Sequence, residues 1–141
     1  MVILAVDLGK VRTGLAICDK TELIASPLGT LEERNAEKLI LKITEVVKER
    51  QAELIVVGLP KNMDGTEGES AVNARTFAEN LSEKCGIPFV MQDERGTTLT
   101  AHNFLNTTNT RGKKRKQIVD TVSAVIILED YLKKRKNKSV T

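Results

Sequence analysis

Aromatic residues are scarce in this sequence of 141 residues, which has no tryptophan, one tyrosine and three phenylalanines. Proteins that bind single-stranded nucleic acids commonly stack successive bases on aromatic side chains. All four aromatic residues here fall in segments with an apolar pattern, so we expect them to pack inside the protein. The composition therefore argues against a binding surface built on base stacking.

Histidine and cysteine are also sparse, with His102 as the single histidine and Cys18 and Cys85 as the two cysteines. The cysteines are far apart in the sequence and show no paired spacing, so they form no standard zinc pattern with His102. We expect both cysteines to be reduced core residues and His102 to lie on a helix surface.

Long hydrophobic runs are missing as well. No apolar stretch reaches the roughly 18 residues of a membrane span, and the N-terminus lacks the basic region and cleavage site of a secretory signal. We therefore expect a cytoplasmic protein without a membrane partner. The length and the 40% hydrophobic content suit one α/β domain, which we place at residues 1–134, followed by a basic, flexible tail at 135–141.

Charge is distributed unevenly along the chain. Residues 1–110 carry 12 basic and 16 acidic side chains, whereas residues 111–141 carry 10 basic and 3 acidic ones. One basic run contains Lys113, Lys114, Arg115 and Lys116. Such a run favours a phosphate-bearing partner, recognised through its backbone and shape, although it is also compatible with a solubilising loop.

Three acidic residues occupy positions where predicted strands end or a predicted helix begins. Asp7 closes an apolar, β-branched run of strand length, and Glu94 closes a second such run. The carboxyl ends of parallel strands collect in one crevice, which would bring these two acids together. Asp120 heads a predicted helix at 118–132, where the small Ala124 permits close approach to a sheet. We expect the three acids to share a site, although each alone also suits a helix cap or dipole partner.

An acidic cluster of this kind requires a cation. Two carboxylates about 4 Å apart repel by roughly 4 kcal/mol at an effective dielectric constant near 20. Ligation by oxygen alone favours Mg²⁺ or Mn²⁺, and a pair of such ions can promote hydrolysis of a phosphodiester bond. The acids therefore predict a metal-dependent nuclease, with Asp7, Glu94 and Asp120 as both metal ligands and catalytic residues.

Four further segments contain candidate substrate-binding residues. Lys10 and Arg12 follow Asp7, and Arg12 is the better phosphate ligand because a guanidinium binds phosphate through two hydrogen bonds. Asn62 belongs to a polar loop at 60–70 whose backbone amides suit a phosphate, although an ordinary connecting loop is the simpler explanation. Arg95 adjoins Glu94 and is expected to orient that acid, to contact substrate, or to form a surface ion pair. The fourth segment is the basic run at 113–116.

The expected order of elements is three strands followed by alternating helices and strands, which describes a three-layer α/β domain. The predicted strands are 2–7, 14–19, 22–31, 53–58 and 87–94, and the predicted helices are 35–51, 69–85, 97–105 and 118–132.

Several short motifs, found in order along nearly the whole chain, resemble those of the YqgF/RuvX family. They are Asp7-Leu8-Gly9 with Arg12-Thr13-Gly14, Gly58-Leu59-Pro60 with Met63-Asp64-Gly65, Asp93-Glu94-Arg95 with Thr97-Thr98, and Lys116 with Asp120 and Ala124. The resemblance implies a ribonuclease H-like fold with a mixed five-stranded sheet flanked by helices. It also implies a nuclease that matures the 5′ end of pre-16S rRNA during ribosome biogenesis, with its acidic site on Asp7, Glu94 and Asp120. The chain departs from the family pattern at Gly96, Gln117 and Ser123, none of which replaces a carboxylate.

Three alternatives stay open at this stage. The family is related to Holliday junction resolvases, and cleavage of a four-way DNA junction would require a homodimer, whereas a monomer suffices for structured RNA. A non-catalytic RNA-binding or ribosome-assembly factor that associates with ribosomal precursors would keep the acids for structure alone. The Asp7-Leu8-Gly9 motif also resembles the first phosphate loop of actin-like ATPases, but those enzymes enclose ATP between two lobes and this chain has the length for one.

Overall fold

The structure, a computed structural model, describes residues 1–62, 64–93 and 113–140, with side chains for 1–62, 64–93 and 122–137. Glu94, Arg95, His102 and the predicted helix at 97–105 lie outside the described residues. The side chains of Asp120 and of the basic run at 113–116 also lie outside them, although these positions belong to a described helix.

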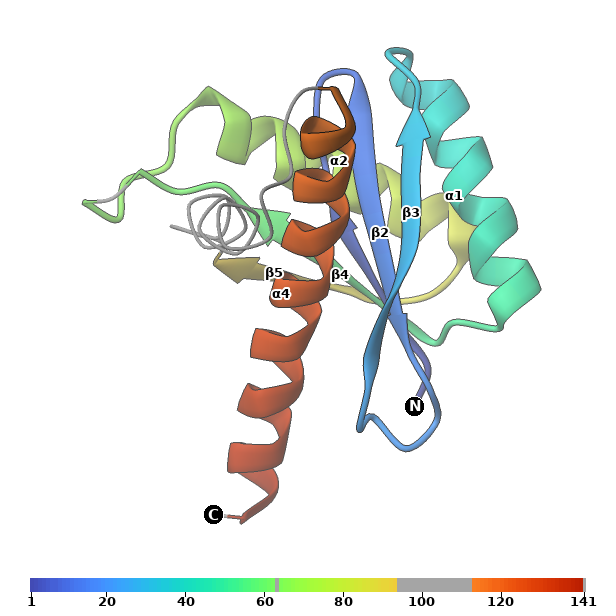
Figure 1. The fold of residues 1–141 in the computed structure, drawn as a ribbon, viewed down its shortest axis with the longest axis vertical. Coiled ribbons are helices and arrows are strands. Elements are labelled where there is room, and N and C mark those ends of the chain that lie inside the picture. Colours follow the sequence, from blue (N-terminus) through green and yellow to red (C-terminus); the bar gives the residue numbers. More distant parts are fainter. Residues whose placement is uncertain (63, 94–112, 141) are drawn as a thin grey trace.

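The strands form one mixed five-stranded sheet in the order β3-β2-β1-β4-β5, with helices on both faces (Figure 1). β1 pairs antiparallel with β2 and parallel with β4, β2 pairs antiparallel with β3, and β4 pairs parallel with β5. The strands are β1 (Ile3–Asp7), β2 (Arg12–Cys18), β3 (Ala25–Glu32), β4 (Leu54–Leu59) and β5 (Phe89–Asp93). This arrangement confirms the expected three-layer α/β fold with a mixed five-stranded sheet.

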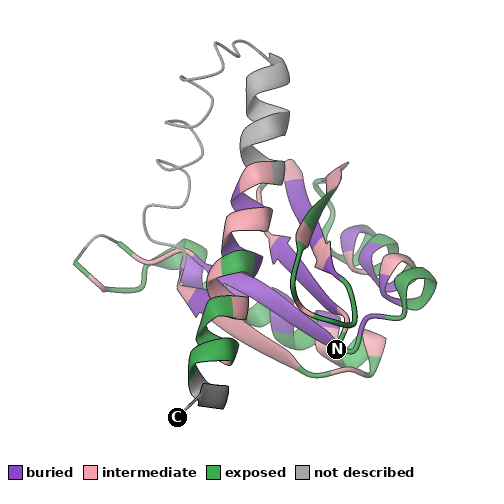
Figure 2. Cartoon of the chain, turned by 60° about the horizontal axis from the view of Figure 1, so that its bottom comes forward, coloured by how far each residue is buried: buried purple, intermediate pink, exposed green. Residues whose placement is uncertain are grey.

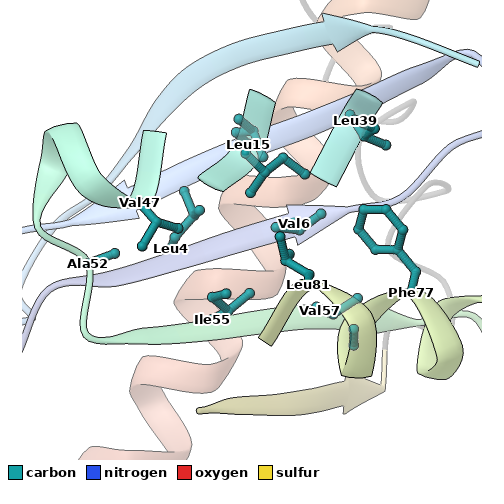
Figure 3. Close-up of a cluster of buried hydrophobic side chains, with 12 residues drawn as sticks. Leu4, Val6, Leu15, Leu39, Val47, Ala52, Ile55, Val57, Phe77 and Leu81 are labelled. Atoms are coloured by element: carbon teal, nitrogen blue, oxygen red, sulfur yellow. The ribbon is translucent and has the colours of Figure 1, made fainter. Parts of the chain in front are cut away.

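Helices α1 (Ala36–Arg50) and α2 (Glu69–Cys85) cover one face of the sheet. Their apolar stripes meet the side chains of β1, β2 and β4 that alternation directs to this face, as Figure 3 shows. The buried residues of this cluster are Leu4, Val6, Leu15, Leu39, Ile43, Val47, Ala52, Ile55, Val57, Phe77, Ala78 and Leu81.

Local sequence signals explain the bounds of α1 and α2. Asn35 precedes α1, and its side-chain oxygen accepts a hydrogen bond from the Lys38 amide at 3.0 Å, which caps the first turn. Gln51 ends α1 in the left-handed region, with φ of 57°. Gly86 ends α2 with φ of 74°, a conformation that glycine adopts without steric cost.

The long helix α4 (Lys113–Val140) covers the other face and buries one side of its surface against the sheet (Figure 2). Ala5, Ala16 and Ala124 are fully buried in this contact, and their small side chains let the helix approach the strands closely. Ile127 and Leu128 pack beside them. No helix within the described ranges is both long and apolar enough to cross a membrane.

Helix α4 runs antiparallel to β1, and an ion-pair cluster at Glu22 joins its C-terminal half to the N-terminus of the chain. Arg135 donates from Nε and Nη2 to the Glu22 carboxylate at 2.7 and 3.2 Å. Glu22 lies in the turn between β2 and β3 and also accepts a hydrogen bond from the amino group of Met1 at 3.3 Å. The C-terminal half of α4 therefore lies where β1 begins, and its N-terminal half lies where β1 ends at Asp7.

We predict that Glu22→Gln weakens this cluster and lowers the free energy of unfolding by about 1 kcal/mol at neutral pH, because a partly exposed charge pair is lost. The hydrogen bonds from Arg135 hold the pKa of Glu22 below its ordinary value of 4.5. A carboxyl group whose pKa is lowered by folding stabilises the fold at pH values above its ordinary pKa. This contribution disappears as the pH falls through the folded-state pKa.

Urea unfolding of the two proteins at several pH values tests this prediction. The stability difference between wild type and Glu22→Gln should be constant above about pH 5 and shrink toward pH 3. Glu129→Gln is the matched control, because Glu129 lies on the same end of α4 and makes no ion pair with any described side chain. A constant difference across the whole pH range would contradict the assignment.

The structure differs from the sequence-based expectation in several bounds. The last helix spans Lys113–Val140 rather than 118–132, and β2 begins at Arg12 rather than Gly14. β3 begins at Ala25 rather than Glu22, because Glu22 adopts φ of 58° in the preceding turn and cannot continue a strand there. The expected boundary after residue 134 falls inside α4, which continues to Val140 and is held by Arg135. Both cysteines have free thiols, Cys18 is buried, and burial raises the pKa of the Cys18 thiol, which keeps it protonated.

Candidate active site

Asp7 is the last residue of β1 and faces the layer that contains α4. Alternation along β1 puts it on the same face as Ile3 and Ala5, which pack in the α4 cluster. Its side chain is half-buried. The residue opposite Asp7 on β2 is Gly14, which has no side chain. The Asp7 carboxylate therefore stands at the carboxyl end of the central strand, on the α4 face of the sheet.

The turn after Asp7 is tight, and a glycine makes it possible. A Cβ atom on Gly9 would overlap the carbonyl oxygen of Arg12, so no other residue fits without moving the backbone. The Gly9 amide donates to the hydroxyl of the fully buried Thr13 at 3.5 Å. The Asp7-Leu8-Gly9 motif is thus explained by the geometry that connects the acid to β2.

The carboxyl ends of β1, β4 and β5 lie along the same edge of the sheet. Val6 of β1 is in register with Val57 of β4, and Leu59 of β4 is in register with Asp93 of β5. Asp93 lies on the α1 and α2 face, because it alternates with Phe89 and Met91, which pack there. Asp93 therefore lies on the face opposite to that of Asp7.

The backbone of α4 passes over the same edge. Ala124 is fully buried against the sheet, and Asp120 precedes it by one helical turn, about 6 Å closer to the end of the sheet where Asp7 lies. Ser123 is also buried, at 1% exposure, and its hydroxyl has no hydrogen-bond partner within the part of the chain that the structure describes. The backbones of the two elements that carry Asp7 and Asp120 therefore meet at the same end of the sheet.

Lys10 and Arg12, which the sequence groups together, are separated by the sheet. Arg12 begins β2 on the Asp7 face, because it alternates with Gly14 and Ala16. Its Nε atom is buried and has no hydrogen-bond partner among the described residues. Lys10 is exposed and lines a groove formed with α1 and α2 on the opposite side. Only Arg12 therefore lies on the face of the predicted acidic site.

The loop containing Asn62 is held closed by its own hydrogen bonds. The Asn62 side chain donates to the Thr66 hydroxyl at 2.9 Å, and its backbone amide donates to the Thr66 carbonyl at 2.9 Å. The Asp64 carboxylate accepts from the Thr66 amide and hydroxyl at 2.9 and 2.7 Å. Gly65 completes the turn with φ of 91°. The Asn62 side chain therefore has a structural role in this loop.

An ion pair anchors this loop to α2. Arg75 donates from Nε and Nη2 to Glu67 at 2.8 and 3.0 Å, and these bonds lower the pKa of Glu67. The sequence alone does not indicate this pair, because the pair depends on the loop conformation. Both residues are partly exposed, so we assign the pair to loop positioning rather than to stability.

The described part of the site contains one of the three predicted metal ligands, Asp7. Within the described residues, no three histidine, cysteine, aspartate or glutamate side chains are grouped as in a metal site. The half-buried Asp7 carboxylate is an oxygen donor of the kind that Mg²⁺ and Mn²⁺ prefer.

Comparison with solved structures defines the class of fold. The RuvC protein of T. thermophilus, in a structure with a Holliday junction substrate, matches with a TM-score of 0.62 at 13% identity and covers 97% of this chain and 96% of its own. The Fowlpox virus resolvase matches with a TM-score of 0.59 at 10% identity, covering 95% of this chain and 98% of its own. The domain therefore has the ribonuclease H-like fold of these resolvases.

Comparison of sequences identifies the family. The family described as "RuvX: Holliday junction resolvase" matches residues 1–134. A relative from Nitrosospira multiformis is 39% identical over 132 residues, covering 94% of this chain and 87% of its own length. One from Caldanaerobacter subterraneus subsp. tengcongensis is 40% identical over 139 residues, covering 97% and 99%. Both carry the name "Putative pre-16S rRNA nuclease". The chain belongs to the RuvX family and is a nuclease, a hydrolase of phosphodiester bonds.

Proposed function

We propose that Asp7, Glu94 and Asp120 form the catalytic site and hold Mg²⁺ or Mn²⁺. The observation that carries this proposal is the position of Asp7, half-buried on the α4 face at the edge over which the N-terminal half of α4 passes. Glu94 directly follows Asp93 at the end of β5, and strand alternation favours the α4 face for its side chain.

When bound, a divalent ion would polarise the phosphate and lower the pKa of a water molecule. The residues of the chain supply position and charge. Asp7 is fixed by its strand and by the tight turn at Gly9, so its oxygens are held without a large entropic cost on binding. Arg12 would donate to a phosphate oxygen, which would satisfy its buried Nε and neutralise charge that develops in the transition state.

Four basic residues in the first turns of α4 would bind the substrate backbone near the acids. They are Lys113, Lys114, Arg115 and Lys116, and Arg95 is placed with them as a contact next to Glu94. Such contacts depend on charge rather than on sequence, so they suit a structured RNA recognised by its shape.

The substrate that we propose is precursor 16S rRNA, cut during maturation of its 5′ end in the cytoplasm. The names of the relatives at 39% and 40% identity support this proposal, because each match covers nearly the whole chain. A monomer is sufficient for one cut in one strand. Association with ribosomal precursors follows from the same assignment.

A four-way DNA junction is the second candidate substrate. The description of the family and the fold shared with RuvC favour it. Junction resolution needs symmetric cuts in two strands, and therefore a homodimer that presents two sites. Oligomeric state during cleavage distinguishes this candidate from the RNA nuclease.

A cleavage assay tests the proposed function. We expect precursor 16S rRNA to be cut with Mg²⁺ or Mn²⁺, single-stranded RNA to be cut more slowly, and a DNA junction to stay intact. Cleavage of the junction alone, by a dimer, would favour the second candidate. No cleavage of any substrate with either ion would contradict the nuclease assignment and favour a non-catalytic RNA-binding factor.

A further inference from the structure

A groove of about 470 Å³ lies on the α1 and α2 side of the sheet, next to the turn that follows Asp7. Leu39 and Phe77 lie at its base, and Figure 3 shows both near the carboxyl end of β1. Its polar lining includes Lys10, Arg34, Ser70, Asn73, Thr76 and Asn80. The groove therefore begins close to the proposed active site but on the opposite face.

Two cations in this groove are available to a ligand. Lys10 and Arg34 make no ion pair with any side chain in the described ranges. The acid that lines the groove, Glu33, is already engaged, because it pairs with Lys42 at 3.1 Å and accepts a hydrogen bond from the Asn35 amide at 3.2 Å. The groove thus has a net positive charge, although residues 1–110 as a whole are acidic.

One face of α2 adds uncharged hydrogen-bonding groups between these cations. Asn73, Thr76 and Asn80 are spaced by three and four residues, so they form a row along one side of the helix. All three are exposed, and none has a hydrogen bond from its side chain to another described residue. Amide and hydroxyl groups can both donate to and accept from a ribose 2′-hydroxyl.

We infer that this groove binds the sugar–phosphate backbone of a single RNA strand that leaves the active site over the turn at Gly9. Lys10 and Arg34 contact phosphates, and the row of Asn73, Thr76 and Asn80 contacts riboses. The inference rests on the proposed nuclease function, because that function makes the active site the place from which the RNA strand enters the groove. It also names RNA as the class of nucleic acid that the enzyme prefers. Aromatic stacking is not required, in keeping with the composition of the chain.

Binding of labelled oligonucleotides in EDTA tests the inference without cleavage. Single-stranded RNA and DNA of the same sequence, from about 4 to about 16 nucleotides long, are titrated by fluorescence anisotropy. Wild type should gain affinity when the RNA is long enough to reach the groove. Arg34→Ala should weaken binding of the longest RNA about three- to tenfold and lower the salt dependence by about one ion, with no effect on the shortest RNA.

Arg50→Ala is the charge-matched control, because Arg50 lies at the other end of α1 and outside the groove. It should bind every oligonucleotide as wild type does. Asn73→Ala/Asn80→Ala should reduce the preference for RNA over DNA while the protein stays folded, since alanine favours the helix. Equal binding of the longest RNA by wild type and Arg34→Ala would overturn the groove as a binding site. An unchanged RNA-to-DNA ratio in the double variant would overturn ribose recognition.

The nuclease function and the groove can fail separately in these experiments. If the protein cuts no substrate, but Arg34→Ala binds long RNA more weakly than wild type, the groove would stand as a binding site and the nuclease function would be contradicted. If the protein cuts precursor rRNA, and Arg34→Ala binds every RNA as tightly as wild type does, the nuclease function would stand and the groove would be contradicted as a binding site.

Discussion

Asp7→Asn is expected to reduce metal-dependent cleavage by roughly 10³-fold or more, because removal of one charged ligand costs several kcal/mol of transition-state stabilisation. The substitution preserves the shape of a half-buried side chain at the end of β1, so the fold should persist. Single-turnover cleavage of precursor 16S rRNA with saturating Mg²⁺ measures the rate, and anisotropy measures RNA affinity, which should change little.

Asp93→Asn is the matched control for this experiment. Asp93 also ends a strand at the same edge of the sheet, but it lies on the α1 and α2 face. Its variant should cut at a rate close to that of wild type. Wild-type activity in Asp7→Asn would eliminate the proposed metal site. Equal losses of activity in Asp7→Asn and Asp93→Asn would show that the total negative charge at this end of the sheet, rather than one metal ligand, supports catalysis.

Gly9→Ala is expected to lower the free energy of unfolding by about 1–3 kcal/mol, because the added Cβ atom overlaps the Arg12 carbonyl oxygen and must displace the turn. Displacement would also shift Asp7, so cleavage should fall with stability. Urea denaturation followed by circular dichroism measures the free energy, and a single-turnover assay measures the rate.

Gly68→Ala provides the comparison for Gly9→Ala. A Cβ atom at Gly68 would meet only the Asn62 side-chain nitrogen, at 4.0 Å, and the backbone φ of −97° suits any residue. Its cost should stay below about 1 kcal/mol, the usual scale for an alanine at a helix N-cap. If both variants were equally stable, the close approach at Gly9 would not be a constraint on the turn.

The elements with strong periodicity could be predicted from the sequence alone. The helix at 35–51 and the strand at 53–58 match α1 and β4 within one residue at each end, because apolar spacing and the Asn35 cap determine them. The place of Asp7 at the end of a strand also follows from its apolar run. These features depend on interactions between residues that are close together in the sequence, so local patterns are enough to predict them.

Features that depend on tertiary contacts were harder to predict. Helix α4 extends to Val140 although its last turns are strongly basic, and the contact of Arg135 with Glu22 is between residues far apart in the chain. The pair of Arg75 with Glu67 needs the closed conformation of the Asn62 loop. Each of these depends on a packing arrangement that local propensity does not encode.

The placement of Lys10 and Arg12 on opposite sides illustrates the same limit within the site. Both residues are basic and stand near Asp7 in the sequence, but the tight turn at Gly9 and the start of β2 at Arg12 separate them. The register of a strand decides which face a residue occupies, and a shift of one residue reverses it. Residue type alone therefore identified candidate phosphate ligands without assigning them to a common surface.

The most direct measurement is the anomalous signal of Mn²⁺ in crystals of the protein soaked with this ion. The account predicts at least one Mn²⁺ peak about 2.0–2.3 Å from a carboxylate oxygen of Asp7, with Glu94 and Asp120 completing the ligands. A well-ordered crystal with Mn²⁺ bound elsewhere, and with the side chain of Glu94 or Asp120 directed away from Asp7, would contradict it.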